Sequence, residues 1–192
     1  MAASSPHDAK TLMRQLMRAQ RRGLAQAAPE AGRRAAALLP LETLPKFAVV
    51  SGYRPQSAEI DPLPLMHRLR EAGARLALPV AVSRDAPLIF RAYDRDAALV
   101  PDAFGIPSPP PEAEVLTPDL VIAPLMAFDR TGARLGQGAG HYDRTLENLR
   151  AGGKVFVLGL AFAGQEVARV PAEPHDQRLD AILTETGYIE AR

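Results

Sequence analysis

The sequence predicts an α/β sandwich built on a mostly parallel sheet, and three observations support this class. Residues 120–123, Leu-Val-Ile-Ala, form an unbroken apolar run, which is typical of a strand buried on both faces of a parallel sheet. Strand-like segments alternate with helix-like segments, as in βαβ units. A length of 192 residues with 47% hydrophobic content suffices for one ordinary domain with a proper core.

The first half of the chain supplies three predicted helices and three predicted strands. The first helix runs to about residue 26, with Ser5 as its N-cap, Pro6 at its first position and an apolar stripe of Leu12, Met13, Leu16 and Met17. Helices are also expected over 29–39 and 64–71, and strands over 46–52, 75–80 and 88–93. The proline-rich segment 101–118 is expected to form no regular element, serving either as a semi-rigid connector or as a wall of a substrate cleft.

The central stretch begins with the strand at residues 120–123, which Pro124 ends, and continues into a loop with Gly132, Gly136, Gly138 and Gly140. A helix over 141–149 and a strand over 154–161 follow. A strand, a glycine-rich loop and a helix in this order are typical of an anion site, because the backbone can approach closely and helix amides point at the ligand. The spacing is neither the dinucleotide fingerprint nor a P-loop, so a flexible turn before a helix is an alternative.

Polar residues around these glycines favour the phosphate site over the plain turn: Asp129, Arg134, Tyr142, Asp143 and Arg144. An arginine can hold phosphate oxygens in a fork, and an aspartate beside phosphates is well placed to bind Mg²⁺. By themselves, Lys10, Arg14, Arg18, Arg21 and Arg22 are interpreted as the solvated surface of the first helix.

Composition limits the classes of function. The formal net charge of +1 gives no bulk electrostatic case for nucleic acid or an anionic membrane as a partner. No apolar run approaches the ~20 residues of a membrane span. The absence of cysteine excludes disulfides and thiolate zinc sites, and it is compatible with a reducing cytoplasm.

Residues 127–144, A-F-D-R-T-G-A-R-L-G-Q-G-A-G-H-Y-D-R, closely resemble the signature of the 5-formyltetrahydrofolate cyclo-ligase family, also called methenyltetrahydrofolate synthetases. Three further matches occur in the family's order: Lys10-x-x-x-Arg14, the strand end Gly52-Tyr53-Arg54 with Glu59-Ile60, and the C-terminal pattern from Pro171 to Asp176. The resemblance implies a three-layer, Rossmann-like α/β/α sandwich formed by residues 1–192 as a single domain. It also implies conversion of 5-formyltetrahydrofolate to 5,10-methenyltetrahydrofolate with ATP and Mg²⁺, releasing ADP and phosphate, by a cytoplasmic monomer without nucleic-acid or membrane partners.

The resemblance also assigns the site residues. ATP is expected on Lys10, Arg14, Arg134, Leu135, Gly136, Gln137, Gly138, Ala139, Gly140, His141 and Tyr142, with Arg134 and Tyr142 as the catalytic residues. The reduced folate is expected on Arg54, Glu59, Gln137, Gly138, Ala139, Gly140 and His141, and Mg²⁺ on Asp143 and Asp176. Tyr53 and the segment Phe104-Gly105-Ile106 are weaker candidates near the folate. Without the family, Glu59 could simply charge the first turn of the next helix, and His175-Asp176 would be a surface turn.

Three residues depart from the family pattern in the glycine loop. Ala139 replaces a glycine or lysine, His141 replaces an aromatic residue, and Gln137 occupies a variable position. A methyl group at position 139 would restrict the backbone if that residue needed a positive φ. Alternatives are therefore a divergent paralogue that activates another formyl or carboxyl group with ATP, and a non-catalytic folate or nucleotide binder. A nucleic-acid module that uses the N-terminal arginines is disfavoured by the net charge.

Overall fold

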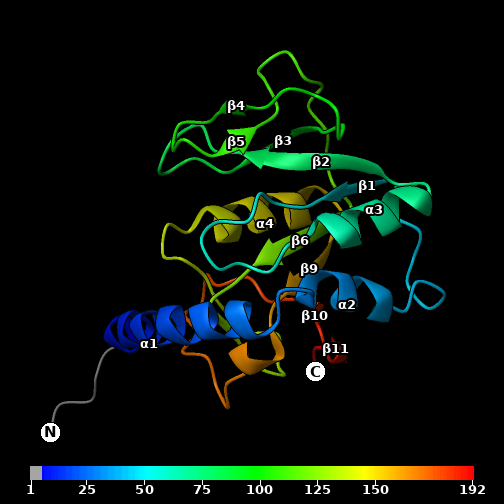
Figure 1. The fold of residues 1–192 in the computed structure, drawn as a ribbon. Helices are drawn as coiled ribbons and strands as arrows, with labels where there is room; N and C mark the ends of the chain where they lie inside the picture. Colours follow the sequence, from blue (N-terminus) through cyan, green and yellow to red (C-terminus); the bar gives the residue numbers. More distant parts are fainter. Residues whose placement is uncertain (1–5) are drawn as a thin grey trace, which may run out of the picture.

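The computed structural model describes residues 6–192 (Figure 1), so the predicted N-cap Ser5 lies outside the described residues. One 7-stranded sheet forms the centre, in the order β11-β10-β9-β6-β1-β2-β3. Its strands are β1 (Val49–Ser51), β2 (Arg75–Val80), β3 (Ile89–Ala92), β6 (Leu120–Pro124), β9 (Phe156–Leu160), β10 (Ala181–Thr184) and β11 (Gly187–Glu190). The inner strands from β10 to β2 run parallel, and the edge strands β11 and β3 run antiparallel to their neighbours. The predicted mostly parallel sheet is confirmed.

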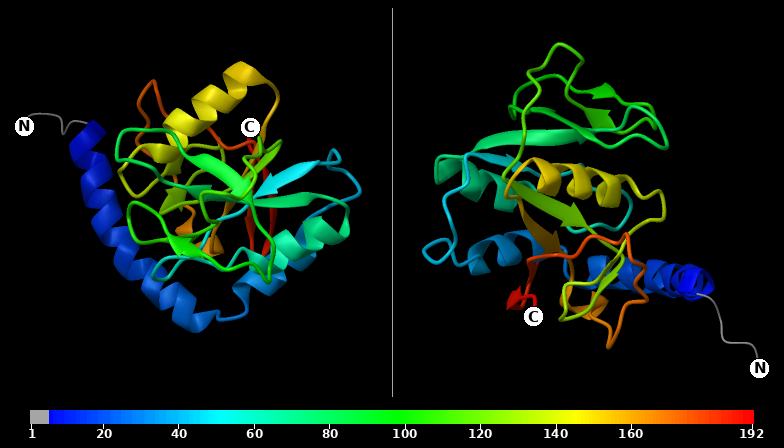
Figure 2. Two further views of the ribbon diagram at one scale, coloured as in Figure 1. Left: turned by 90° about the horizontal axis from the view of Figure 1, so that it is seen from above. Right: turned by 180° about the vertical axis from the view of Figure 1, so that it is seen from behind.

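Alternate side chains of the inner strands build the two layers of core on either side of the sheet. One face, with Leu78 and Ile122, packs against α2 (Ala31–Leu38) and α3 (Leu63–Glu71). The other face, with Val121 and Val157, packs against α4 (His141–Gly152), through Leu146. Seen from above, α4 lies on one side of the sheet and α2 and α3 lie on the other (Figure 2). The period of two along each strand therefore produces the predicted three-layer α/β/α sandwich.

Helix α1 (Pro6–Ala27) follows the predicted boundaries, but the predicted apolar stripe is wrong in part. Leu12 and Leu16 are 59% and 63% exposed, whereas Met17 is buried in a small cluster with Met126 and Leu135. The other buried positions of the helix are Lys10 and Arg21. The helix thus presents Lys10 and Arg21 to the body of the protein, where both find carboxylate partners.

Several short elements were not predicted. The segment between residues 100 and 108 contains a pair of antiparallel strands, β4 (Val100–Pro101) and β5 (Pro107–Ser108), so the prediction of no regular element in 101–118 was wrong in part. Asp102 makes this pair possible, because its Oδ1 accepts hydrogen bonds from the amides of Phe104 (2.8 Å) and Ile106 (3.0 Å) and so closes the turn. The central loop likewise holds a hairpin of β7 (Ala127–Phe128) and β8 (Arg134–Leu135). A 3₁₀ turn, η1 (Ala163–Gln165), follows β9.

The order of the strands fixes where a ligand can bind. From β1 the chain continues through α3 to β2 on one side, while β6 pairs with β1 on the other. In open α/β sheets, ligands bind outside the carboxyl ends of the strands at such a switch point. Tyr53, Pro79 and Pro124, which stand at or just after the carboxyl ends of β1, β2 and β6, all line the main cavity. No helix in the described part of the chain is long and apolar enough to cross a membrane.

Candidate active site

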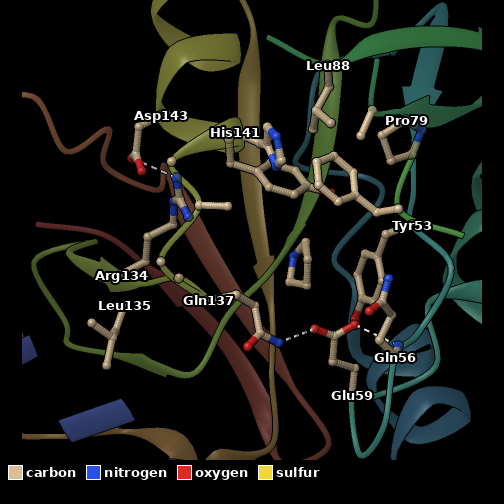
Figure 3. Close-up of a pocket in the computed structure, with 18 of the residues that line it drawn as sticks. Tyr53, Gln56, Glu59, Pro79, Leu88, Arg134, Leu135, Gln137, His141 and Asp143 are labelled. Atoms are coloured by element: carbon tan, nitrogen blue, oxygen red, sulfur yellow. Dashed lines mark hydrogen bonds and ion pairs between the residues drawn. The ribbon is translucent and has the colours of Figure 1, made fainter. Parts of the chain in front are cut away.

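A cavity of about 580 Å³ lies at this edge of the sheet, and Figure 3 shows part of its lining. The residues predicted for ATP, folate and metal all contribute to its wall: Lys10, Arg14, Arg54, Glu59, Arg134, Leu135, Gly136, Gln137, Gly138, Ala139, Gly140, His141, Tyr142, Asp143 and Asp176. They come from α1, from the segment after β1, from the glycine loop with the start of α4, and from the loop before β10. The structure therefore brings together residues that are up to 166 positions apart.

The glycine loop has the backbone conformation that its sequence predicts. Gly138 and Gly140 have φ angles of +109° and +71°, in the region that favours glycine, and Gly140 leads directly into α4. Ala139 is not among the positive-φ residues, since Ser57 is the one non-glycine residue of this kind in residues 6–192. The methyl group at position 139 is thus compatible with the loop. The first amides of α4 lie beside the glycine loop in the cavity wall, and the start of a helix favours a bound anion.

Arg14 and Arg134 place positive charge beside the loop. Arg14 Nε donates to the Gly136 carbonyl oxygen at 3.0 Å, and its guanidinium lies close to Gly138. Arg134 Nη2 donates to Asp143 Oδ1 at 2.7 Å, and the guanidinium lies 5.8 Å from the centre of the Tyr142 ring. The Arg134 side chain is 3% exposed, and its Nε is buried without a hydrogen-bond partner among the described residues. An arginine held in this way is oriented before any ligand arrives.

Lys10 joins α1 to the C-terminal part of the chain. Its Nζ lies 2.5 Å from Glu173 Oε2 and 2.7 Å from Asp176 Oδ2. The hydrogen bond from Lys10 lowers the pKa of Glu173. Burial alone would raise the pKa of Asp176, but hydrogen bonds from Lys10 and from the Glu173 amide outweigh it and lower that pKa. Glu173 was not predicted as a site residue; its position three residues before Asp176 is the signal that could have revealed it.

The candidate metal ligands lie on the side of the cavity that Lys10 lines. One ligand atom each from Glu173, His175 and Asp176 falls within 4.8 Å of the others. The backbone amide of Gln177, the neighbour of Asp176, donates to Asp143 Oδ1 at 3.0 Å, so the two aspartates predicted for Mg²⁺ belong to adjoining walls. Both described contacts of the Asp143 carboxylate reach Oδ1. Carboxylate oxygens of this kind fit a magnesium ion that is also held by phosphates and water.

The opposite wall contains Glu59 in a network of donors (Figure 3). The Gln56 amide donates to Oε2 at 2.9 Å, and Gln137 Nε2 donates to Oε1 at 3.1 Å. Tyr53 is buried beside it and donates its hydroxyl to the Ile60 carbonyl oxygen at 2.7 Å. Glu59 is therefore part of the cavity wall, which its alternative role at the start of the next helix does not explain.

Two tyrosines of the cavity, the buried Tyr53 and the half-buried Tyr142, hold their protons firmly. Burial, followed by the charge of Glu59, raises the pKa of Tyr53 and the pKa of Tyr142 above the ordinary phenol value. A tyrosine with a raised pKa stays neutral near pH 7, so Tyr142 can donate a hydrogen bond but is a poor general base.

His141 and Phe104 form the rim above this wall. Their rings meet edge to face with centroids 5.5 Å apart, and His141 Nε2 lies 3.0 Å from the Ser83 carbonyl oxygen. Phe104 is 50% exposed and lines the cavity together with Ile106. The proline-rich segment thus supplies part of the cavity wall, as one of its two interpretations predicted.

Three polar residues have other positions than the sequence suggested. Asp129 is 4% exposed and shapes a turn by accepting from Thr131 and Val170, and it does not line the cavity. Arg144 binds the carbonyl oxygens of Arg84 and Ala139 from outside the lining. The interpretation of Arg21 as solvated surface is wrong, because Arg21 is 4% exposed. Positions 10, 14, 17 and 21 share one helical face, and this spacing is the signal that could have revealed it.

The fold and the cavity define a doubly wound α/β protein with a ligand site at the switch point of its sheet. The model of the 5-formyltetrahydrofolate cyclo-ligase family matches residues 6–185, and the chain belongs to this family. The 5-formyltetrahydrofolate cyclo-ligase of Mycolicibacterium smegmatis is 39% identical over 150 residues, which cover 74% of this chain and 76% of that protein. The enzyme of the same name from Escherichia coli K12 is 37% identical over 137 residues, which cover 69% and 75%.

Solved structures agree with this assignment. The 5,10-methenyltetrahydrofolate synthetase of Aquifex aeolicus superposes with a TM-score of 0.78 at 28% identity, covering 95% of this chain and 93% of that one. A synthetase of the same name from Mycoplasma pneumoniae, at 22% identity, shares the fold with a TM-score of 0.70 over 92% and 98% of the two chains. The predicted family, its enzyme class and the Rossmann-like sandwich are confirmed.

Proposed function

We propose that this protein cyclises 5-formyltetrahydrofolate to 5,10-methenyltetrahydrofolate, with ATP and Mg²⁺ as reactants and ADP and phosphate as further products. One observation carries the proposal. A single cavity holds the cations Lys10, Arg14 and Arg134 beside a glycine loop, with Glu59 across from them. A cavity of about 580 Å³ falls in the ordinary range for small-molecule sites, about 300–1,000 Å³.

The chemistry explains why two ligands must share one cavity. The N5 formyl group is an amide, so its carbon is a poor electrophile and its oxygen leaves badly. Transfer of the γ-phosphoryl group to the formyl oxygen turns that oxygen into part of a phosphate leaving group. N10 then attacks the carbon and loses its proton, and inorganic phosphate departs with the oxygen. The protein contributes positioning and charge neutralisation, as in other phosphoryl transfers.

The residues present divide this work between the two ends of the cavity. Lys10, Arg14 and Arg134 neutralise the triphosphate, and the amides of the glycine loop and of the start of α4 bind the transferred phosphoryl group. Glu59 accepts hydrogen bonds from the amide and amine groups of the pterin. Asp143 and Asp176 would hold Mg²⁺, which screens phosphate charge when bound. Tyr142 remains a neutral hydrogen-bond donor beside Arg134.

Departures in the loop keep a second function open, namely activation of another formyl or carboxyl substrate on the same scaffold. The rim of the cavity is formed by His141 and Phe104, and the family carries an aromatic residue at position 141. A paralogue would therefore differ at the end of the cavity that binds the substrate. A pure folate or nucleotide binder would have no need of two predicted metal carboxylates. Action as a cytoplasmic monomer, formed by residues 1–192 as one domain, stays a prediction.

A spectrophotometric assay tests the proposal. The purified protein is mixed with 5-formyltetrahydrofolate, and formation of the methenyl product is followed by its absorbance, with and without ATP and with Mg²⁺ present or removed by a chelator. We expect product only when both ATP and Mg²⁺ are present. Binding of Mg-ATP without product would favour the paralogue, and failure to bind either ligand would refute the proposal.

A further inference from the structure

Arg21 is a buried cation that stands behind the cavity wall. It is 4% exposed, and it is absent from the lining of the cavity. Its Nη1 lies 3.3 Å from the Leu125 carbonyl oxygen and 3.5 Å from Glu59 Oε1. Its Nε is buried and has no hydrogen-bond partner among the described residues. Burial of a guanidinium costs free energy unless its charge is paired with a carboxylate or satisfied by hydrogen bonds.

Glu59, the partner of Arg21, does face the cavity. Its side chain is only 6% exposed, so its negative charge is also largely removed from water. Its other donors, the Gln56 amide and the Gln137 side chain, are neutral. Within residues 6–192, Arg21 is the cation paired with this carboxylate. It therefore supplies the counter-charge that holds this carboxylate in place.

Helix α1 connects this pair to the other end of the site. Lys10 and Arg14 line the cavity at the glycine loop and at the C-terminal carboxylates, whereas Arg21, further along the same face, reaches the back of Glu59. Gln137 of the glycine loop donates to the same Glu59 oxygen from the front. The carboxylate is thus held between a helix and a loop that both belong to the predicted nucleotide end.

We infer that Arg21 is a positioning residue for the folate end of the site, where it fixes the Glu59 carboxylate from behind without touching the substrate. The inference rests on the proposed function, because it takes Glu59 to be the residue that binds the folate. Arg21 also holds the Leu125 carbonyl oxygen, but within residues 6–192 its one link to a residue that lines the cavity runs through Glu59, so its loss should matter for the ligand that Glu59 contacts and not for the nucleotide. A merely structural arginine would affect both ligands alike.

Calorimetric titration of the intact protein with 5-formyltetrahydrofolate, and separately with Mg-ATP, tests the inference. Arg21→Met should raise the Kd for 5-formyltetrahydrofolate by about tenfold or more, because one partner of a buried charge pair is lost. The Kd for Mg-ATP should change by less than about twofold, which is no more than an ordinary surface substitution would cause. Arg21→Lys, which keeps the charge, should recover part of the folate affinity. Arg22→Met is the matched control, since Arg22 is exposed on the next position of the helix.

A second variant, Glu59→Gln, distinguishes loss of the ion pair from poor folding of Arg21→Met. In Glu59→Gln the charge that needs a partner is gone, so adding Arg21→Met should change the folate Kd by less than about twofold. The inference is overturned if Arg21→Met weakens folate binding equally in both backgrounds, if it weakens Mg-ATP binding as much as folate binding, or if it leaves folate binding unchanged. If the unmodified protein binds no 5-formyltetrahydrofolate, the proposed function itself fails, which is a distinct result.

Discussion

Asp143→Asn separates the proposed metal role of Asp143 from its role in the fold, because asparagine keeps the shape and removes the charge. In the structure, Asp143 Oδ1 accepts from Arg134 Nη2 at 2.7 Å and from the Gln177 amide at 3.0 Å. An asparagine oxygen can still accept both hydrogen bonds. The Arg134 guanidinium, whose side chain is 3% exposed, would lose its counter-charge.

The size of the effect on stability follows from burial. Removing one partner of a fully buried pair costs about 3–5 kcal/mol. The Asp143 side chain is 22% exposed, so water compensates in part and we expect a cost of about 2–3 kcal/mol. For a domain of this size, that corresponds to a fall in Tm of about 4–12 °C. Since domains are usually stable by about 5–15 kcal/mol, the variant should still be folded at 25 °C.

The effect on activity should be larger than this loss of stability implies. With one metal carboxylate removed, we expect the rate of methenyltetrahydrofolate formation at 25 °C to fall more than about tenfold and the apparent KM for Mg²⁺ to rise. Glu147→Gln is the control, because Glu147 is exposed on the same helix one turn further on. A folded Asp143→Asn protein whose rate and Mg²⁺ dependence match those of the unmodified protein would remove Asp143 from the metal site.

Two further predictions concern the ion-paired cluster and the glycine loop. Lys10→Met should raise the Kd for Mg-ATP by about tenfold or more in calorimetry, because the proposed phosphate contact of Lys10 would be lost. It should also flatten the acid dependence of stability: the pKa values of Glu173 and Asp176 are lowered in the folded state, so their stabilisation is complete above about pH 4.5 and is lost as the pH falls through the lowered values. Urea unfolding should therefore separate the two proteins more at about pH 7 than at about pH 3, and an equal difference at both pH values would contradict this argument. Gly132→Ala should lower the Tm by at least about 4 °C, because Gly132 has φ +79° and a Cβ would lie 2.4 Å from the Leu179 carbonyl oxygen. Gly152→Ala, a helical position with nothing within 4 Å of the added Cβ, should leave the Tm unchanged or raise it, and the reverse order of the two variants in a thermal melt would count against the packing argument.

Much of the fold could be predicted because its signals are local. The strand at 75–80 was predicted with the boundaries of β2, and the first helix was predicted to end within one residue of α1. Of the elements that were missed, β4, β5, β7 and β8 have two residues each, which is too short for a hydrophobic period. They pair as hairpins, and such hairpins depend on turns like the one that Asp102 closes. The four-residue strands β10 and β11 and the 3₁₀ turn η1 were missed as well.

The site could be predicted as a set of residues but not as a set of contacts. The residues predicted for ATP, folate and metal all line one cavity, and their individual roles stay predictions. The sequence signals could place Glu173 and Arg21 near the site, but they did not indicate that Lys10 would pair with Glu173 or that Arg21 would pair with Glu59. These pairs join positions 163 and 38 residues apart in the sequence. Which side chains meet over such separations depends on how helix α1 packs against the rest of the protein. The exposure of Leu12 and Leu16 has the same origin.

The link between Lys10 and the carboxylates of Glu173 and Asp176 has a consequence during synthesis. Helix α1 is synthesised long before the acidic partners of its lysine, which do not exist until residues 173 and 176 have been added. Until then, the cationic face of the newly made helix has no anchor at that point. A released chain truncated before position 173 should therefore carry a helix accessible to protease near Lys10, whereas the chain of residues 1–192, in which Glu173 and Asp176 can pair with Lys10, should be protected there.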